Sequence, residues 1–374
     1  MSTSWWLAEQ APPLRSRRLD DPVDVAIVGA GVTGCSCALT LARGGLRVRV
    51  YEARTVASGA SGRNGGFALR GGAPPYDKAR TQLGLERARL LWACTERAQA
   101  RMAELAGDAF RAEGSLRLAA DAAERSELEA EFAALREDGF AAQWLDELPE
   151  PLAGRFFGAI RHPGDGALQP ARWVRRLAAH AVDAGAEIRE HSRVEGVDEL
   201  PAERVVVATD GYGADLIPEL APVVTPVRGQ VIVTAPLPER LFPCPHYSRG
   251  GYHYGHQPPD LRLVLGGRRD TDLDAEFTAE EATTAPIQSA LESFARELVG
   301  FAPTVQARWA GIWGRTPDEY PLAGPLPRQD RVWVATGYSG HGNVLGFACG
   351  ELVGRALLGD PQPELDLFDP SRLL

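Results

Sequence analysis

Lysine is almost absent from this chain: Lys78 is the only one among 374 residues, so the 40 basic residues are nearly all arginine. Catalysis by a lysine amine is therefore excluded everywhere except at Lys78. The net charge of −10 argues against nucleic acid or an anionic membrane as a partner. The apolar content of 44% and charged content of 24% are ordinary for a globular chain.

Metal-site spacing, secretion signals and membrane spans are also missing from the sequence. No cysteine pair has CxxC spacing and no histidine accompanies one in a metal pattern. The N-terminus lacks the basic and apolar regions of a signal peptide, and no apolar run approaches the length of a membrane span. We expect a reduced, metal-free, cytoplasmic protein. Its five cysteines are Cys35, Cys37, Cys94, Cys244 and Cys349.

The most informative segment, 23–52, begins with VDVAIV, an apolar run typical of a buried parallel strand. Gly29, Gly31 and Gly34 follow at the spacing GxGxxG. In such a turn the first glycine permits the tight bend and the second lets the backbone approach a pyrophosphate. The third lets the following helix pack closely on the strand. The pattern predicts a dinucleotide-binding turn.

The residues after this turn complete a βαβ unit. We predict a helix over 38–43, ended by Gly44 and Gly45, and a second strand over 46–51. Glu52 then stands where an acid accepts hydrogen bonds from adenosine ribose hydroxyls. The helix N-terminus offers free N–H groups and partial positive charge to phosphates. The alternative, a glycine-rich structural turn, leaves Glu52 unexplained.

A glycine-rich loop over 53–72 comes directly after this unit. Such a loop brings backbone N–H groups and hydroxyls close to a cofactor. Its polar donors are Ser58, Ser61, Arg63 and Asn64. We expect these residues at the cofactor; a disordered linker is the alternative.

Strand, turn and helix patterns recur in the middle and at the end of the chain. One runs over 203–217, with Thr209, Asp210 and Gly211 in the turn and a helix from Ala214; the other runs over 332–359. Further helices are predicted over 79–106, 121–138 and 286–300, and within 166–188 a helix that starts at Pro170, ends at Gly185 and leads into a strand. Strands are predicted over 114–119, 223–237 and 261–267.

These patterns predict an α/β fold with an inserted β-rich domain of the α+β kind. We assign 1–78, 151–220 and 306–374 to a nucleotide-binding domain. The remaining segments, 79–150 and 221–305, form the inserted substrate domain. Trp5 and Trp6 in the N-terminal lead are expected to dock as an arm.

Four stretches together resemble the FAD-dependent oxidoreductases of the D-amino acid oxidase, glycine oxidase and sarcosine oxidase superfamily. They are GAGVTG with Glu52, GASGRNGG at 59–66, VVVATDGYG at 205–213 and ATGYSGHGN at 335–343. The stretch TPDEYPLAGP fits as well, and GASGRNGG is most similar to the branch that includes gamma-glutamylputrescine oxidoreductase. The resemblance implies a discontinuous Rossmann-like FAD domain with an inserted, mostly antiparallel sheet.

The resemblance also implies FAD, held non-covalently. Covalent members attach the flavin to a cysteine before the TPD stretch or to an N-terminal histidine. Here Gly311 stands near the first position, and the first histidine is His162. The helix after Gly340 would face the pyrimidine end, where a reduced flavin is anionic. The implied cofactor-binding residues are Gly29, Gly31, Val32, Thr33, Gly34, Glu52, Ala53, Arg54, Ser58, Ser61, Gly62, Arg63, Asn64, Gly65, Gly66, Val194, Thr209, Asp210, Gly211, Gly311, Gly340, His341, Gly342, Asn343 and Val344.

Two departures from the family pattern bear on the substrate. Trp313, in the stretch GIWG, stands where amino-acid oxidases carry a carboxylate-binding arginine, and Val344 stands where sarcosine oxidases carry a lysine. We therefore expect an amine larger than glycine that is not held mainly through an α-carboxylate. Arg315, Arg70 and Arg268 stay open as substitute anchors.

The resemblance implies an FAD-dependent amine oxidase or dehydrogenase. A hydride passes from the α-carbon of an amine or amino-acid-derived substrate to flavin N5, and water hydrolyses the imine. Molecular oxygen and a carrier both stay open as acceptors. Three alternatives also stay open. The substrate could be a non-amine such as a hydroxy acid, the protein could be a D-amino acid or glycine-type oxidase with a non-standard carboxylate anchor, or it could be a subunit that binds FAD without turnover. Candidates for the substrate face are His253, Tyr254, Trp313 and His341.

Overall fold

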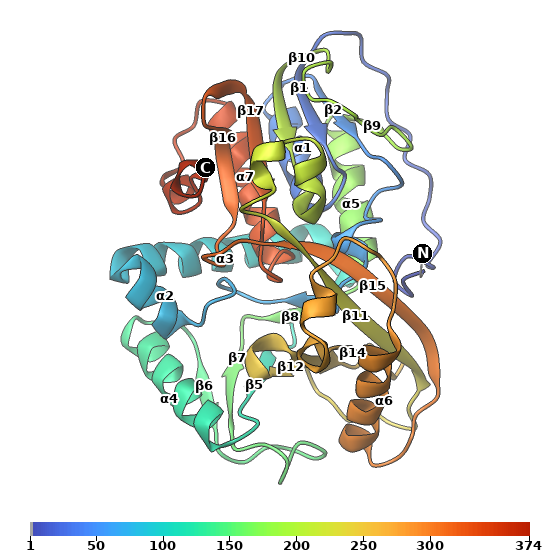
Figure 1. The fold of residues 1–374 in the computed structure, drawn as a ribbon, viewed down its shortest axis with the longest axis vertical. Helices are drawn as coiled ribbons and strands as arrows, with labels where there is room; N and C mark the ends of the chain where they lie inside the picture. The colour runs from blue at the N-terminus through green and yellow to red at the C-terminus, as the bar shows by residue number, and fades with distance from the viewer. Residues whose placement is uncertain (1–2) are drawn as a thin grey trace.

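The computed structural model describes residues 3–374 and contains two large sheets, between which the chain passes repeatedly (Figure 1). The first sheet has six strands in the order β16-β17-β10-β1-β2-β9, and only β16 runs antiparallel to its neighbour. Its strands are β1 (Val23–Val28), β2 (Val48–Tyr51), β9 (Glu187–Arg189), β10 (Ala202–Val207), β16 (Leu322–Leu326) and β17 (Gln329–Thr336).

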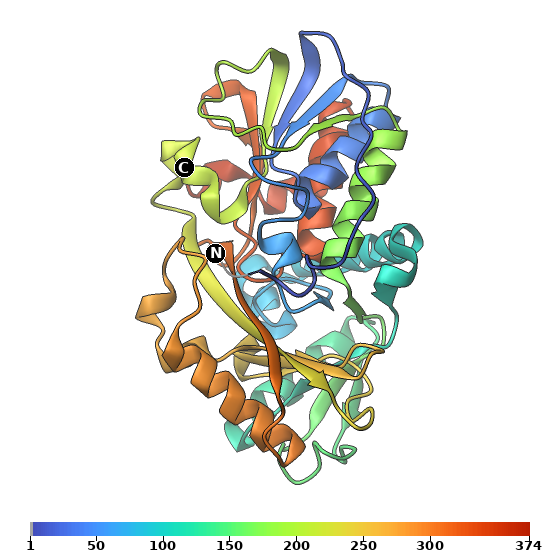
Figure 2. The same cartoon turned by 90° about the vertical axis from the view of Figure 1, so that its right-hand side faces the viewer.

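The first sheet is covered on both faces, which explains its runs of Val, Ile and Ala. Val25 and Ile27 of β1 face a core shared with helices α1 (Val32–Arg43), α5 (Pro170–Asp183) and α7 (Val344–Leu357). Figure 2 shows these three helices together on one side of the sheet. On the other face, Ala26 and Val28 pack with apolar residues of the segment after β10.

Helices α1 and α7 meet almost backbone to backbone. Gly346, Gly350 and Gly354 recur every four residues and so lie on one face of α7. A β-carbon added at Gly350 would lie 2.4 Å from the carbonyl oxygen of Thr33 on α1. The glycine stripe therefore sets how closely the two helices approach.

The second sheet has eight strands in the order β15-β11-β14-β13-β12-β5-β7-β6, antiparallel except between β12 and β5. Helix α6 (Ala285–Val299) packs on it through Ile287 and Leu291. A small antiparallel sheet joins β3 (Phe67–Ala68), β8 (Gly166–Leu168) and β4 (Phe110–Arg111). The strands of the second sheet are β5 (Ser115–Leu118), β6 (Gln143–Leu145), β7 (Ala159–His162), β11 (Thr225–Pro236), β12 (His246–Ser248), β13 (His253–His256), β14 (Arg262–Gly267) and β15 (Val305–Arg315).

Three further helices complete the fold. The helix predicted over 79–106 is divided into α2 (Tyr76–Leu83) and α3 (Leu85–Ala106), because Gly84 adopts a positive φ of 82°. Helix α4 (Ala122–Glu137) begins at Asp121, whose carboxylate accepts a hydrogen bond from the Glu124 amide. Helix α3 packs against α7 and α5. No helix of residues 3–374 has both the length and the apolar character needed to cross a membrane.

The structure corrects two helix predictions. Helix α1 begins at Val32, six residues before the predicted start, because it opens directly from the glycine turn. The helix predicted from Ala214 is wrong: the segment forms only a short 3-10 helix, Asp210–Asp215. Two glycines lie inside that turn and Pro218 follows it closely, so an α-helix has no room to propagate.

The division of the chain into domain segments stays a prediction. Strand β7 lies within the range 151–220 and β15 almost entirely within 306–374, yet both belong to the second sheet. The local sequences of β7 and β15 predict strands, but they do not predict which strands these two pair with.

The N-terminal arm docks against the glycine-rich loop. Trp6 is only 2% exposed, and its indole N–H donates to the carbonyl oxygen of Asn64 at 2.8 Å. Its ring stacks on His256 with centroids 5.9 Å apart. The arm thus supports the loop that carries Ser61 and Asn64.

We predict that Trp6→Ala lowers the free energy of unfolding by about 3–5 kcal/mol, because a buried aromatic is lost and a cavity is left. Trp5, which is more exposed and lies beside it, provides the control: Trp5→Ala should cost less. Urea unfolding followed by circular dichroism measures both. Equal losses in the two variants would contradict the docking described above.

Candidate functional site

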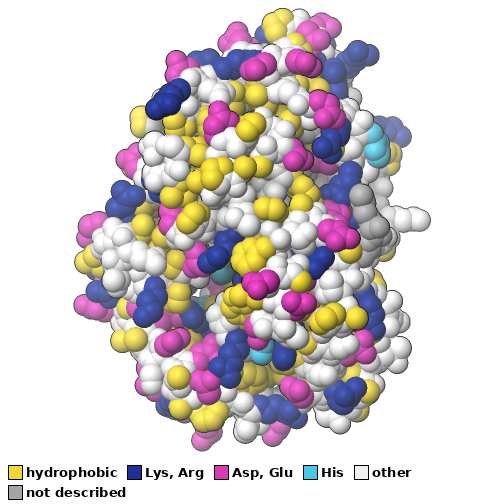
Figure 3. Space-filling view, viewed as in Figure 1, with side chains coloured by type: hydrophobic (Ala, Val, Ile, Leu, Met, Phe, Trp, Pro, Cys, Tyr) yellow, Lys and Arg dark blue, Asp and Glu magenta, His cyan; other side chains and the backbone are white. Residues whose placement is uncertain are grey.

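A cavity of about 790 Å³ lies where the parallel strands of the first sheet end and where the second sheet begins. Gly29, Gly31 and Glu52 line one part of it, and Tyr254 and Trp313 line another. Figure 3 shows the surface hollowed left of centre, with cationic and hydrophobic side chains at the rim. The carboxyl ends of parallel strands are where folds of this type bind ligands.

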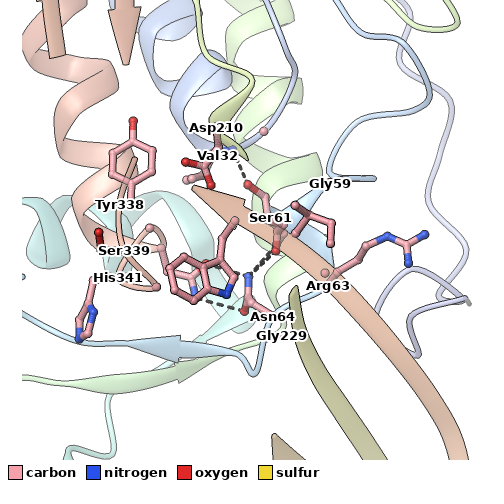
Figure 4. Close-up of a pocket in the computed structure, with 18 of the residues that line it drawn as sticks. Val32, Gly59, Ser61, Arg63, Asn64, Asp210, Gly229, Tyr338, Ser339 and His341 are labelled. Atoms are coloured by element: carbon pink, nitrogen blue, oxygen red, sulfur yellow. Dashed lines mark hydrogen bonds between the residues drawn. The ribbon is translucent and has the colours of Figure 1, made fainter. Parts of the chain in front are cut away.

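The glycine turn leaves the N-terminus of α1 open to the cavity. No side chain caps this helix, although the Val32 amide donates to the Ser61 hydroxyl at 3.0 Å (Figure 4). A β-carbon at Gly31 would lie 3.0 Å from the same hydroxyl oxygen, and one at Gly34 would lie 1.9 Å from the Gly29 carbonyl oxygen. The turn therefore requires glycine at position 34, and the space beside Gly31 together with the remaining amides of the helix N-terminus suits a pyrophosphate.

Glu52 is held in a fixed orientation at the cavity. Its carboxylate accepts hydrogen bonds from the Ala30 amide at 2.9 Å and the Arg54 amide at 2.8 Å. A carboxylate has about four acceptor positions, so further ones remain for ribose hydroxyls. Val194 also lines the cavity.

The N-terminus of α7 is clamped to the glycine-rich loop. The side-chain amides of Asn343 and Asn64 donate to each other at 3.0 and 3.2 Å, and Asn343 also donates to the Phe67 carbonyl oxygen at 2.7 Å. Two motifs that lie far apart in sequence thus share one wall. No side chain caps α7, so its first amides can face an anion.

Asp210 ties together two other segments of the wall. It is buried in the turn after β10 and accepts hydrogen bonds from the amides of Gly314 at 3.0 Å and Gly337 at 2.9 Å. Burial raises its pKa to about 6, against the lowering effect of these backbone hydrogen bonds. Asp210 therefore positions the ends of β15 and β17 rather than offering a free charge.

His341 faces the cavity as a neutral imidazole. Burial lowers its pKa to about 4. Its Nδ1 is buried, and within residues 3–374 no group hydrogen-bonds to it. Figure 4 shows Tyr338, Ser339 and His341 along one segment, on the opposite side of the view from Arg63. His341 therefore brings an unpaired polar atom to the site.

Two other predicted substrate-face residues line the cavity, and one does not. The Tyr254 ring packs so closely on Gly266 that a β-carbon there would lie 2.3 Å from the phenol oxygen. Trp313 lines the wall from β15. His253 is not part of the lining; its Nε2 lies 3.3 Å from a carboxylate oxygen of Asp270.

Most predicted cofactor residues line the cavity. Five lie behind its wall instead: Gly34, Ser58, Gly62, Gly66 and Gly211. These five allow close packing or bond within their own loop, as Ser58 does with Thr55 at 2.6 Å. Those in the wall are Gly29, Gly31, Val32, Thr33, Glu52, Ala53, Arg54, Ser61, Arg63, Asn64, Gly65, Val194, Thr209, Asp210, Gly311, Gly340, His341, Gly342, Asn343 and Val344.

The same wall contains a polar group of which only Arg70 was predicted. Arg117 pairs with Glu131, and Arg70 lies 3.1 Å from the Nδ1 of His162. Arg117 stands between two leucines of strand β5, which is a sequence signal for a charge in a buried strand. Arg269 also lines the cavity and was missed beside Arg268. Within residues 3–374, no three His, Cys, Asp or Glu side chains are grouped to hold a metal.

Comparison with known families and proteins agrees with this geometry. The model of the DAO family, described as FAD dependent oxidoreductase, matches residues 24–356. The chain is 29% identical to a probable oxidoreductase OrdL of Rhizobium meliloti, over 94% of this chain and 86% of that protein. It is 28% identical to the gamma-glutamylputrescine oxidoreductase of Escherichia coli, over 91% of this chain and 84% of that protein.

A solved structure has the same fold. The glycine oxidase from Geobacillus kaustophilus superposes with a TM-score of 0.77 at 25% identity, over 95% of this chain and 98% of that one. The cradle at Gly31, the acceptors of Glu52 and the open ends of α1 and α7 all fit the dinucleotide of such a cofactor.

We predict that Gly31→Val abolishes FAD retention, because its side chain would fill the space that a pyrophosphate needs. Gly164→Val is the matched control, since a β-carbon there meets nothing within 4 Å. The ratio of flavin absorbance to protein absorbance after gel filtration measures retention. Full FAD content in the Gly31 variant would refute the cradle assignment.

Proposed function

Since the chain belongs to the DAO family of FAD-dependent oxidoreductases, we propose that it oxidises the carbon–nitrogen bond of an amine or amino-acid-derived substrate. The observation that carries the proposal is the continuity of one cavity from the dinucleotide cradle to Tyr254, Trp313 and His341. Bound FAD would supply the acceptor for the hydride, which carries both electrons from the substrate carbon. Relatives named glycine oxidase and gamma-glutamylputrescine oxidoreductase support an amine as donor.

The side chains of the cavity supply binding and orientation. Tyr254 and Trp313 offer aromatic surfaces that hold the reacting carbon in place, which is where much of the rate gain of such a site arises. His341 stays uncharged at neutral pH because its pKa is about 4. An uncharged imidazole avoids repelling a cationic amine and can hydrogen-bond its nitrogen, which favours binding of the amine in a reactive orientation.

The flavin attachment we propose is non-covalent. The cavity lining, as far as residues 3–374 describe it, contains no cysteine, and Gly311 stands near the position of the family's attachment cysteine. All five cysteines are buried in the structure. Only non-covalent contacts, namely hydrogen bonds and helix N-termini, would therefore hold the cofactor.

We predict that an anaerobic panel of amines and amino acids bleaches the flavin absorbance band, whereas the matching hydroxy acids do not. The reason is that the uncharged His341 does not repel a cationic amine and can hydrogen-bond its nitrogen. Stopped-flow absorbance at the flavin maximum gives the rates. Faster bleaching by hydroxy acids than by every amine tested would show that the donor class is wrong.

Acid precipitation of the purified protein should release all of the flavin into the supernatant, since no side chain is expected to bond to it. The measurement is the absorbance of supernatant and pellet, with the intact mass of the polypeptide as a second readout. A pellet that stays yellow, or a mass raised by one FAD, would establish covalent attachment.

A further inference from the structure

Arg269 is the one arginine in the cavity wall that lacks an ion-pair partner among residues 3–374. Its guanidinium forms no hydrogen bond or ion pair within this part of the chain. Each of the other arginines of the wall lies within ion-pair distance of a carboxylate: Arg54, Arg63, Arg70, Arg117 and Arg193. Arg269 is partly buried, and a cation with reduced access to water and no partner is costly, so an anion supplied from outside would be bound favourably.

Two aromatic rings hold the Arg269 guanidinium in place. Its central carbon lies 4.4 Å from the Tyr252 ring centroid and 5.1 Å from the Trp313 ring centroid. Stacking on ring faces fixes the plane of a guanidinium while its N–H groups point outward, ready for a carboxylate. Burial lowers the pKa of Arg269, which shows that water solvates the charge poorly.

Two neutral donors lie in the same wall. The Tyr254 hydroxyl and the Trp313 indole N–H have no hydrogen-bond partner in the described part of the chain. Tyr254 belongs to β13 and pairs with Gly266 of β14, three residues before Arg269. One cation and two neutral donors therefore border a single region of the cavity.

The other candidate anchors are engaged elsewhere. Arg70 pairs with Glu96 at 2.6 Å and Arg315 pairs with Glu319 at 3.0 Å. Arg268 lies over the ring of Phe294 and is not part of the cavity lining. Trp313, which replaces the expected arginine on β15, instead supports the guanidinium that comes from the segment after β14.

We propose that Arg269 binds a carboxylate of the substrate, so that the substrate is an amine that also carries a carboxylate group. The part of the proposal that concerns the amine rests on the proposed function, whereas the part that concerns the carboxylate does not. It departs from the expectation, based on Trp313 and Val344, that a carboxylate contributes little to binding. Arg269 would thus bind the carboxylate in place of the family's arginine, from a different segment of the chain.

The first test uses benzoate as a carboxylate probe and benzamide as its neutral analogue, with the FAD-loaded protein. Binding is read from the shift of the flavin absorbance spectrum. We expect benzoate to bind the parent protein more tightly than benzamide does. We expect Arg269→Met to raise the dissociation constant of benzoate by about tenfold or more. Arg269→Lys should recover part of the affinity, because it restores charge without the planar fork.

Arg262→Met serves as the control, because Arg262 pairs with Asp260 and is not part of the cavity lining. It should leave benzoate binding unchanged. FAD content and melting temperature confirm that each variant folds. Three results would each overturn the proposal: no benzoate binding to the parent, unchanged binding in the folded Arg269 variants, or a loss in Arg268→Met as large as in Arg269→Met.

The second test separates this proposal from the proposed function. Amino acids and their amides are compared as anaerobic reductants of the flavin. We expect Arg269→Met to raise KM for the acids about tenfold, with a smaller change for the amides. If no amine reduces the flavin, the proposed function fails, whereas the benzoate titration still decides the role of Arg269.

Discussion

The close contact between α1 and α7 is the constraint on which the cofactor site depends. The glycine stripe of α7 lets its backbone reach that of α1, where any side chain at Gly350 would collide with Thr33. The contact sets the N-termini of both helices at one cavity, and the hydrogen bond between the Thr33 and Tyr338 hydroxyls at 3.0 Å joins the first turn of α1 to the segment before α7. Both positive helix ends therefore face the same cavity.

The wall of the cavity is assembled by a few polar side chains that bind backbone groups of distant segments. Asp210 holds the ends of β15 and β17, and Asn343 holds the loop before β3. Trp6 supports the same loop from behind. These contacts satisfy buried N–H and C=O groups that the loops would otherwise leave unpaired, so each one stabilises the wall as well as shaping it.

Much of the fold was predictable, because its signals are local. The GxGxxG spacing with Glu52, and the strand and helix periodicities, depend on neighbours in sequence, and the structure confirms the mixed α/β architecture. The helix expected from Ala214 was wrong because glycine and proline spacing outweighed the apolar pattern. The lining of the cavity was less predictable: Gly66 serves packing rather than the wall, and Arg117 is joined to the site only by the second sheet.

The sequence by itself determined the nucleotide cradle, because its glycines serve local needs: Gly29 adopts a positive φ of 104°, Gly34 approaches the Gly29 carbonyl oxygen, and the position of Gly31 is the one that lets a backbone approach a pyrophosphate. It could not distinguish Arg268 from Arg269, two identical side chains in one stretch. Only the tertiary structure decided between them. Arg268 takes a positive φ of 58°, and its side chain lies over Phe294 on helix α6. Arg269 instead stacks on Tyr252 and Trp313 in the cavity wall, because the fold alone brings together the turn before β13, which carries Tyr252, and strand β15, which carries Trp313.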